Sequence, residues 1–343
     1  MANETITIAL DAMGGDFAPR VPVEAAVWAA REVDCEIVVV GERAALEPEL
    51  SRHAPATRRV RIHHCSQTLA IDEPPTALLR EKAQASVRVA CELVRAGTAQ
   101  AVISAGNTGA MMVAGKHVLG TLSGIDRPAI ATLLPRKRGT SVLLDSGANV
   151  DCKPHYLLQF SLMGQVYARL VAGVERPRVA LLSNGSEPGK GNELTRKAYP
   201  LLEESIAGFI GNVEGRDLFR GKADVIVCDG FVGNLVLKSA EAADAQIRLL
   251  LKESIARSVF TRIGAWLIRG VLTELQRRAD YRAVGGSLLL GLDGVALVCH
   301  GASNARSLCN AIRMARQCVA GRLVETLSVE FARHAQTDSY ASG

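Results

Sequence analysis

The chain has 343 residues, of which 48% are hydrophobic and 22% are charged, and its formal net charge is +5. This composition is that of a folded globular protein and excludes a disordered chain. The basic residues are not gathered into a tract with interleaved aromatic residues, so we expect no nucleic-acid partner. A mild positive charge is compatible with an acidic protein partner or an anionic lipid surface.

The sequence carries no sign of a secretory signal, a membrane span or a metal centre. No basic segment precedes the first apolar residues, which end at Asp11, so we expect a cytoplasmic protein. The longest apolar stretch, residues 287–298, contains Asp293 and is shorter than the roughly 20 residues that cross a bilayer. The eight cysteines form no Cys-x-x-Cys pair, which argues against a zinc site and a disulfide framework and predicts reduced, mostly buried thiols.

Short β-branched runs alternate with longer helical patterns along the chain. Helices are expected over residues 22–32, with Pro22 in the first turn, and over residues 76–96, closed by Gly97. This alternation is typical of βαβ units and predicts a three-layer α/β/α sandwich with a largely parallel sheet. The expected strands cover residues 5–10, 36–40, 60–63, 101–104, 141–145, 178–182, 225–228 and 295–300.

The chain shows no linker, composition shift or internal repeat, so we expect a single catalytic domain over residues 1–335. Residues 235–278 contain two long helical patterns with no strand between them, which predicts a helical arm that projects from the sheet. Residues 336–343 are small and polar and are expected to form a flexible tail.

Polar, glycine-rich segments follow six of the expected strands, and ligands of open α/β sheets bind at the carboxyl ends of strands. Glycine lets backbone N–H groups approach an oxyanion, and the helix that follows adds a partial positive charge. A tight turn explains any one such segment, but six of them at one sheet edge predict a phosphate or carboxylate ligand. The segments are residues 11–16, 105–110, 145–149, 185–192, 229–234 and 300–304.

Two common phosphate-binding signatures are absent. Three residues separate Gly185 from the Gly189-Lys190 pair, and no Ser or Thr follows the lysine, so this segment is not a Walker A loop. A dinucleotide-binding pattern would need glycine at the position of Leu194 and would lie in the first βα turn. A nicotinamide cofactor therefore has little support.

Taken together, these segments resemble the acyl-acyl carrier protein:phosphate acyltransferase family, which makes acyl phosphate for bacterial phospholipid synthesis. The chain departs from the family pattern at Ser183, at Pro188-Gly189 and at Ser287. The resemblance implies a fold similar to isocitrate and isopropylmalate dehydrogenases and to phosphotransacetylase, a homodimer, no organic cofactor, and acyl carrier protein and inorganic phosphate as substrates. It rests on residues 10–16, 104–110, 127–129, 147–151, 190–192, 228–231 and 300–301, and on Gly233 and Asn234 with Lys238.

For such a reaction the site must position phosphate and stabilise an oxyanion, because phosphate is already anionic. We take Lys190 as a point charge for phosphate, Asn107 and Asn234 as oxyanion donors, and His300 as a proton donor to the departing thiolate. The structural alternatives are a solvated lysine, helix-capping asparagines and a core histidine. Further candidates for phosphate or substrate binding are Gly14, Gly15, Asp16, Gly106, Thr108, Gly109, Asn149, Gly185, Gly191, Asn192, Asp229, Gly230 and Gly233.

In the arm, apolar residues recur at helical spacing with arginines between them. Because Gly264 and Gly270 interrupt this pattern, we expect a hairpin whose tip presents the apolar stretch between them to an anionic membrane surface. An enzyme placed there would pass its acyl phosphate to a membrane glycerol-3-phosphate acyltransferase. The alternative is that the apolar stripe packs in a dimer interface. The residues proposed for membrane contact are Trp266, Leu267 and Ile268 with Arg262 and Arg269.

Two other functions stay open on the sequence alone. One is an NAD(P)- and metal-dependent decarboxylating dehydrogenase of the same fold. The other is a noncatalytic lipid-surface scaffold whose polar loops are only turns.

Overall fold

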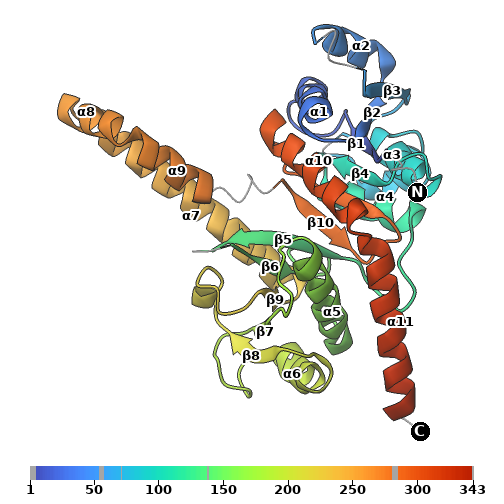
Figure 1. The fold of residues 1–343 in the computed structure, drawn as a ribbon, viewed down its shortest axis with the longest axis vertical. Helices are drawn as coiled ribbons and strands as arrows, with labels where there is room; N and C mark the ends of the chain where they lie inside the picture. Colours follow the sequence, from blue (N-terminus) through green and yellow to red (C-terminus); the bar gives the residue numbers. More distant parts are fainter. Residues whose placement is uncertain (1–4, 54–57, 71, 137–138, 280–284, 342–343) are drawn as a thin grey trace.

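The computed structural model describes residues 5–53, 58–70, 72–136, 139–279 and 285–341. Its strands form one sheet, with helices on both faces (Figure 1). The strands are β1 (Thr7–Asp11), β2 (Glu36–Gly41), β3 (Val60–His64), β4 (Ala101–Ser104), β5 (Ala129–Pro135), β6 (Thr140–Leu144), β7 (Val179–Leu182), β8 (Phe209–Val213), β9 (Val225–Val227), β10 (Ser287–Leu290) and β11 (Val295–Val298). Their order across the sheet is β3-β2-β1-β4-β11-β10-β5-β6-β9-β7-β8.

The helices cover the two faces of the sheet, because side chains alternate along each buried strand. In β1, for example, Ile8 and Leu10 join one apolar cluster with α1, α5, α6, α10 and α11, whereas Ala9 joins another with η1, α3 and α4. The predicted α/β/α sandwich is confirmed. The helices are α1 (Arg20–Glu32), α2 (Arg43–Ser51), η1 (Pro75–Leu79), α3 (Ser86–Arg95), α4 (Thr108–Val118), α5 (Pro154–Leu170), α6 (Glu193–Ser205), η2 (Gly215–Asp217), α7 (Gly230–Ala256), α8 (Val259–Leu267), α9 (Arg269–Ala279), α10 (Ala305–Ala320) and α11 (Leu323–Ala341).

The sheet consists of two parallel blocks that run in opposite directions. Strands β3, β2, β1, β4 and β11 form one block, and β6, β9, β7 and β8 form the other. Strands β10 and β5 lie between them, and β11, β10, β5 and β6 pair antiparallel in turn. The sheet is largely parallel, as predicted, but the prediction that all six polar loops share one edge of it is wrong, because the strands of the two blocks point in opposite directions.

The carboxyl ends of the two blocks nevertheless meet, because the blocks are staggered along β5. Ala131 in β5 pairs with Leu288 at the start of β10 on one side and with Leu144 at the end of β6 on the other. Ser287 at the start of β10 pairs in turn with Val298, the last residue of β11. The polar loops after β11 and β6 thus face each other in the middle of the sheet.

Each strand that the sequence predicts is present, with both ends within two residues. Strands β5, β8 and β10 are additional. The helix predicted over residues 22–32 is confirmed as α1, but the one over residues 76–96 is wrong: η1 is followed by turns, and α3 begins only at Ser86. The reason is tertiary, since Gln67 accepts hydrogen bonds from the backbone N–H groups of Gln84 and Ser86, and this pairing breaks the helical ladder.

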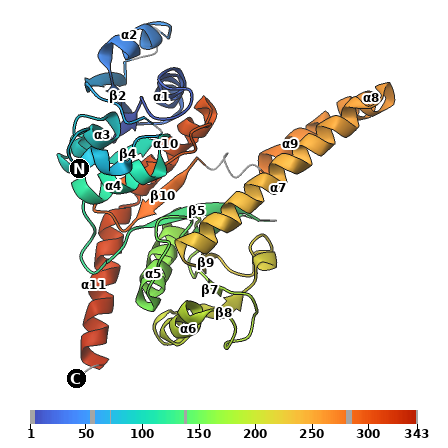
Figure 2. The ribbon, with the colours of Figure 1, turned by 180° about the vertical axis from the view of Figure 1, so that it is seen from behind.

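Helices α7, α8 and α9 form the projecting arm, which leaves the body next to β9 (Figure 2). The hairpin turns at Arg257 and Ser258, where the Ser258 hydroxyl accepts from the N–H of Thr261 and caps α8. The tip predicted between Gly264 and Gly270 is therefore in the wrong place, because this cap makes the turn earlier and helix continues on both sides of Ile268.

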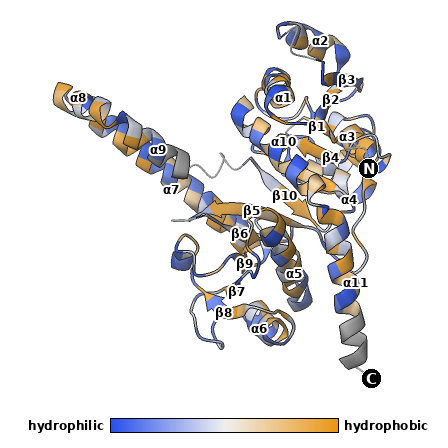
Figure 3. Ribbon diagram, viewed as in Figure 1, coloured by the Kyte–Doolittle hydropathy of each residue, from blue (hydrophilic) through white to orange (hydrophobic). Residues whose placement is uncertain are grey.

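Hydrophobic residues recur along the arm (Figure 3), and several of them are exposed. Phe260, next to the turn, is 87% exposed, and Trp266 and Leu267 on the returning limb are also exposed. The guanidinium of Arg269 lies over the Trp266 ring, 5.3 Å from its centroid. Among the described helices, none is both long enough and apolar enough to cross a bilayer.

At the other end of the chain, α11 reaches Ala341 and so includes most of the predicted tail at residues 336–343, of which the last two lie outside the described residues. The flexibility of this segment stays a prediction. The expected burial of the cysteines is confirmed, since each is buried except the half-buried Cys152.

Asp224, directly before β9, links the ends of three strands, because its partner Arg178 precedes β7 and its partner Arg136 follows β5. Its carboxylate, 6% exposed, accepts from Nε of Arg178 at 2.9 Å and from Nη1 of Arg136 at 2.8 Å. Burial by itself would raise the pKa of Asp224, but hydrogen bonds from the two arginines outweigh it and lower this pKa to about 2. The ion pair therefore stabilises the fold above the ordinary aspartate pKa, and this stabilisation is lost as the pH falls from about 4 through 2.

We expect Asp224→Asn to lower the free energy of unfolding by about 2 kcal/mol at pH 7, measured by urea unfolding. The difference from wild type should shrink at pH 2.5, where the native carboxylate begins to protonate. Glu193→Gln, which removes an exposed ion pair with Lys197, is the control and should change stability little. A deficit for Asp224→Asn that is independent of pH would contradict the assignment.

Candidate active site

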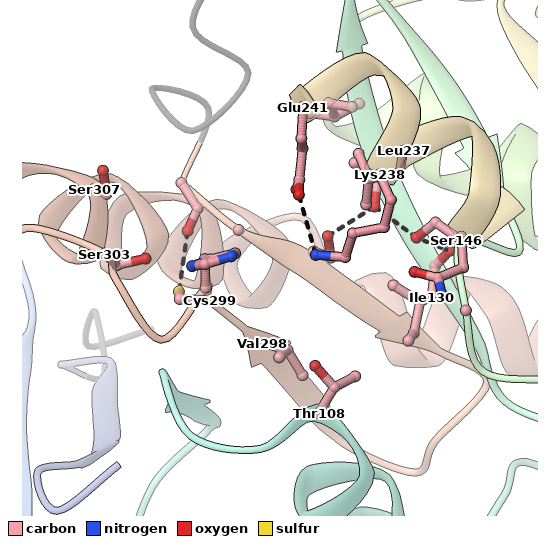
Figure 4. A pocket seen from close by; sticks show the side chains of 18 residues that line it. Thr108, Ile130, Ser146, Leu237, Lys238, Glu241, Val298, Cys299, Ser303 and Ser307 are labelled. Atoms are coloured by element: carbon pink, nitrogen blue, oxygen red, sulfur yellow. Dashed lines mark hydrogen bonds and ion pairs between the residues drawn. The ribbon is translucent and has the colours of Figure 1, made fainter. Parts of the chain in front are cut away.

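A cavity of about 300 Å³ lies where the carboxyl ends of the two blocks meet, beside the first turns of α7 (Figure 4). Four of the six polar loops, those after β4, β6, β9 and β11, bring side chains to it or lead into helices that do, and the central strands supply its floor. Its polar lining consists of Thr108, Thr132, Ser146, Asn234, Lys238, Glu241, Ser287, His300, Ser303 and Ser307.

Helix α7 presents one charged face to the cavity. Asn234, Lys238 and Glu241 follow each other at intervals of four and three residues, which places them on the same side of a helix. The Lys238 Nζ lies 3.0 Å from Oε2 of Glu241, whose side chain is only 14% exposed, whereas that of Lys238 is half exposed. The ion pair thus lies in the cavity wall, and its lysine can reach a ligand.

Three hydroxyl groups form a chain across the floor. Thr132 Oγ1 lies 2.7 Å from both Ser146 Oγ and Ser287 Oγ, and Ser146 Oγ lies 3.2 Å from the Ile130 carbonyl oxygen. The carbonyl can only accept, so Ser146 donates to it, Thr132 donates to Ser146, and Ser287 donates to Thr132. With all three protons used in the chain, Ser287 Oγ is left as an acceptor in the lining of the cavity.

His300 and two helix N-termini complete the polar lining. The N–H of Ala302 donates to Nδ1 of His300 at 3.1 Å, so the neutral ring carries its proton on Nε2 and can donate from there. Thr108 begins α4, and Ser303 lies two residues before Ala305, the first residue of α10. The partial positive charge of these N-termini favours an anion in the cavity.

Asp145 shapes the loop that follows β6. Its buried carboxylate accepts from the N–H groups of Ile130, Gly147, Ala148 and Asn149. Burial raises the pKa of Asp145, and these donors oppose the shift. The loop is thereby held at the position against which α7 packs.

Of the residues that the sequence predicts for the site, the structure places Thr108, Asn234 and His300 together in the cavity. Asn107 and Asp229 cap α4 and α7, because their side chains accept from the N–H groups of Ala110 and Val232. For Asn107 this geometry is that of a helix cap, the alternative to its predicted role as an oxyanion donor.

Asn192 and Asn149 also have structural contacts. Asn192 caps α6 by accepting from Thr195 N–H at 2.9 Å. The Asn149 side chain donates to the Pro128 carbonyl oxygen at 2.8 Å and to Asp145 at 2.9 Å. Both side chains therefore organise the loops in which they lie.

Lys190 does not line the cavity. Its exposed side chain packs over Gly185, where an added Cβ would lie 2.7 Å from the Lys190 Cγ. The neighbouring Gly191 and Asn192 line a second hollow of about 330 Å³ together with Asp229. Because residues 229 and 232 face this hollow and residues 234 and 238 face the cavity, α7 separates the two. A role for Lys190 in phosphate binding stays a prediction.

The other predicted binding residues are mostly glycines at positions where backbones approach closely. At Gly233 an added Cβ would overlap the carbonyl oxygen of Asp145, so only glycine lets α7 reach the loop after β6. The loop after β1 packs in a similar way, since the N–H of Asp16 donates to the Gly301 carbonyl at 2.9 Å. An added Cβ would have a less severe but still close neighbour, at 2.5–3.1 Å, at five further glycines outside the cavity lining, Gly14, Gly15, Gly106, Gly109 and Gly230.

The sequence did not predict five of the residues in the cavity lining, namely Lys238, Glu241, Ser146, Thr132 and Ser287. Helical spacing from Asn234 is a signal that points to the first two. Thr132 and Ser287 lie on strands that the sequence did not predict, so no sequence pattern pointed to them as site residues. Within the described part of the chain, no group of three or more His, Cys, Asp or Glu residues is placed to hold a metal ion.

Comparison with solved structures shows the same fold. A phosphotransacetylase from Streptococcus pyogenes superposes with a TM-score of 0.63 over 94% of this chain and 95% of its own, at 14% identity. A branched-chain phosphotransacylase from Enterococcus faecalis gives a TM-score of 0.54 over 92% of this chain and 100% of its own, at 16% identity. The expected likeness to the phosphotransacetylase fold is confirmed.

The family model described as "Fatty acid synthesis protein" matches residues 6–325. A phosphate acyltransferase of Syntrophotalea carbinolica is 48% identical over 95% of this chain and 94% of its own. Another phosphate acyltransferase, from Heliobacterium modesticaldum, is 50% identical over 91% of this chain and 93% of its own. The chain therefore belongs to the fatty acid synthesis protein family and, with these relatives, to its phosphate acyltransferases.

Proposed function

We propose that this protein transfers a fatty acyl group from acyl carrier protein to inorganic phosphate and thereby supplies acyl phosphate for phosphatidic acid synthesis. Family membership supports the acyl transfer. The observation that carries the proposal is the cavity itself, which combines a lysine, hydroxyl groups and two helix N-termini with an apolar wall. Such a lining suits a small oxyanion attached to, or attacking, an apolar group.

In this proposal phosphate lies between Lys238 and the N-terminus of α4, where a full and a partial positive charge offset its own. The thioester carbonyl lies beside Asn234 and Nε2–H of His300, which donate to the oxyanion that develops on attack. The first carbons of the acyl chain contact the apolar part of the lining, formed by Leu133, Leu237 and Val298.

The reaction needs no side-chain nucleophile. An oxygen of hydrogen phosphate forms the new bond to the acyl carbon, and the C–S bond breaks with its electron pair on sulfur. The proton that the departing thiol requires is the one that hydrogen phosphate brings, so the equation balances without an external acid. In this proposal His300 only donates a hydrogen bond from Nε2 to the oxyanion. On the sequence alone, it instead has the role of transferring a proton to the departing thiolate.

We expect the purified protein to discharge acyl carrier protein loaded with a long acyl chain only when phosphate is present, with acyl phosphate detected by mass spectrometry. Equal release of free thiol without phosphate would identify a thioesterase instead. A change in nicotinamide absorbance with a hydroxy-acid substrate would favour the dehydrogenase that the sequence left open, and lipid binding without turnover would favour the scaffold.

We also propose that the arm makes a peripheral membrane contact and that the protein works as a homodimer, as its resemblance to the family implies. The exposed apolar residues of the arm and the neighbouring arginines support a surface for anionic lipid. Helix α7 runs from Lys238 in the cavity to Ala256 at the turn, about 27 Å at 1.5 Å per residue. If the turn of the arm touches the membrane, the cavity lies about this distance from the lipid surface. The product would then be released close to a membrane acceptor such as a glycerol-3-phosphate acyltransferase.

Two arm variants distinguish residues that contact the membrane from residues that contact a second subunit. We expect Val259→Ser with Phe260→Ser, at the turn, to lower the affinity for anionic liposomes, measured by co-sedimentation, by about thirtyfold, because each of the two apolar contacts adds on the order of 1 kcal/mol. The combined change of Trp266, Leu267 and Ile268 to alanine tests the returning limb. Light scattering reports the dimer: a monomeric variant would assign its residues to the subunit interface, and full lipid binding by both variants would contradict the membrane contact.

A further inference from the structure

Asp11, the last residue of β1, is a buried carboxylate that the proposed reaction does not use, and its side chain connects two strand ends. Its Oδ1 accepts from the N–H of Met13 at 3.1 Å, and its Oδ2 accepts from the hydroxyl of Ser104 at 2.6 Å. A distance of 2.6 Å is typical of a hydroxyl that donates to an ionised carboxylate. Burial raises the pKa of Asp11, and hydrogen bonds from these two groups, from the Ser86 side chain and from the backbone at Gly14 oppose the shift. Asp11 therefore links its own strand to the end of β4.

Ser104 extends this link to the start of α4. It is the last residue of β4, and its hydroxyl both donates to Asp11 and accepts from the N–H of Gly106 at 3.0 Å. Gly106 directly precedes Asn107, which caps α4, and Thr108, which lines the cavity. Two hydrogen bonds thus lead from the buried carboxylate to the peptide that sets where α4 begins.

The neighbouring loop, which carries His300, is held in a different way. The N–H of Cys299 donates to the backbone carbonyl of Ser104 at 2.8 Å. A change in the Ser104 side chain leaves this backbone bond in place. The side chains of Asp11 and Ser104 therefore act on the α4 side of the cavity and not on the His300 side.

We propose that Asp11 is a positioning residue for phosphate, which acts through Ser104 to hold the N-terminus of α4 against the cavity. This inference rests on the proposed function, which places phosphate between Lys238 and that N-terminus. The attraction between an anion and a helix N-terminus falls off within the first turn, so a small displacement of α4 weakens it. Asp145 has a comparable place in the second block, where it holds the loop after β6.

The test measures phosphate binding to the whole protein by isothermal titration calorimetry, together with the KM values for phosphate and for acyl carrier protein. Asp11→Asn keeps the size of the side chain but removes its charge, and Ser104→Ala removes the hydroxyl. We expect each variant to weaken phosphate binding by about tenfold, the effect of one charge-assisted hydrogen bond, and to raise the KM for phosphate in proportion. The KM for acyl carrier protein should stay unchanged. The combined variant should lose no more than either single one, because both changes break the same chain of bonds.

Ser141→Ala is the matched control. The hydroxyl of Ser141 is also buried and donates to the Ala223 carbonyl at 3.0 Å, but it lies in the second block, outside the cavity lining. This variant should lower the free energy of unfolding and leave phosphate affinity unchanged. Ser104→Ala, which removes a single oxygen atom, carries the test if Asp11→Asn fails to fold. Unaltered phosphate affinity, equal increases in both KM values, or additive losses in the combined variant would each overturn the inference.

Turnover separates this inference from the proposed function. Phosphate binding that depends on Asp11 and Ser104, in a protein that does not discharge acyl carrier protein, would uphold the inference and contradict the function. Phosphate-dependent discharge with an unaltered KM for phosphate in both variants would uphold the function and overturn the inference.

Discussion

Replacement of Lys238 by methionine is expected to lower kcat/KM for phosphate by about a hundredfold, because it removes the ammonium that offsets the charge of the attacking anion. Methionine retains much of the apolar stem, so the fold should be unaffected. The rate of acyl phosphate formation at limiting phosphate measures the effect, and thermal unfolding checks the fold.

Lys190→Met is the matched control, because both lysines are exposed but only Lys238 lines the cavity. If phosphate binds beside Lys238 as proposed, and not at Lys190 as the sequence predicts, Lys190→Met should cause a loss of less than about threefold, in the range of a surface change. The reverse result, with a large loss at position 190 and a small one at 238, would move the phosphate site to the hollow on the other side of α7.

Gly233→Ala is expected to lower activity by more than a hundredfold and the free energy of unfolding by about 3 kcal/mol. Its new Cβ would overlap the carbonyl oxygen of Asp145, so the first turns of α7 would have to move away from the loop after β6. Asn234 and Lys238 move with that helix, which misplaces both groups relative to the substrates.

Gly189→Ala provides the comparison for this prediction, since no atom lies within 4 Å of its added Cβ. Activity and stability should both be close to wild type, measured by the same discharge assay and by urea unfolding. A Gly233→Ala protein with normal activity would show that the close approach of α7 is not required for the site.

The sequence by itself determined which residue types are available and roughly where the elements lie. Its alternation of β-branched runs and helical patterns predicted the sandwich, because both periodicities are local. The loops rich in Gly, Asn and Asp marked the strand ends, and among them Thr108, Asn234 and His300 reach the cavity.

Only the tertiary structure decided how these loops come together. The sequence of a strand-to-helix loop indicates where a strand ends. It does not indicate in which direction that strand runs in the sheet. The opposed blocks and their stagger at Ala131 depend on β5 and β10, whose pairing partners are distant in the chain. The same pairing places Thr132 beside Ser287, 155 residues away.

Tertiary contacts also decided between the two interpretations of single residues. Asn107 and Asn234 follow strands in similar sequence contexts, yet one accepts a backbone N–H at a helix start and the other lines the cavity. Lys190 and Lys238 are both lysines soon after a glycine, but only the second lies on the helix face that meets the carboxyl ends of both blocks. Local sequence specifies the chemistry of a side chain, whereas packing between distant segments specifies what that side chain can touch.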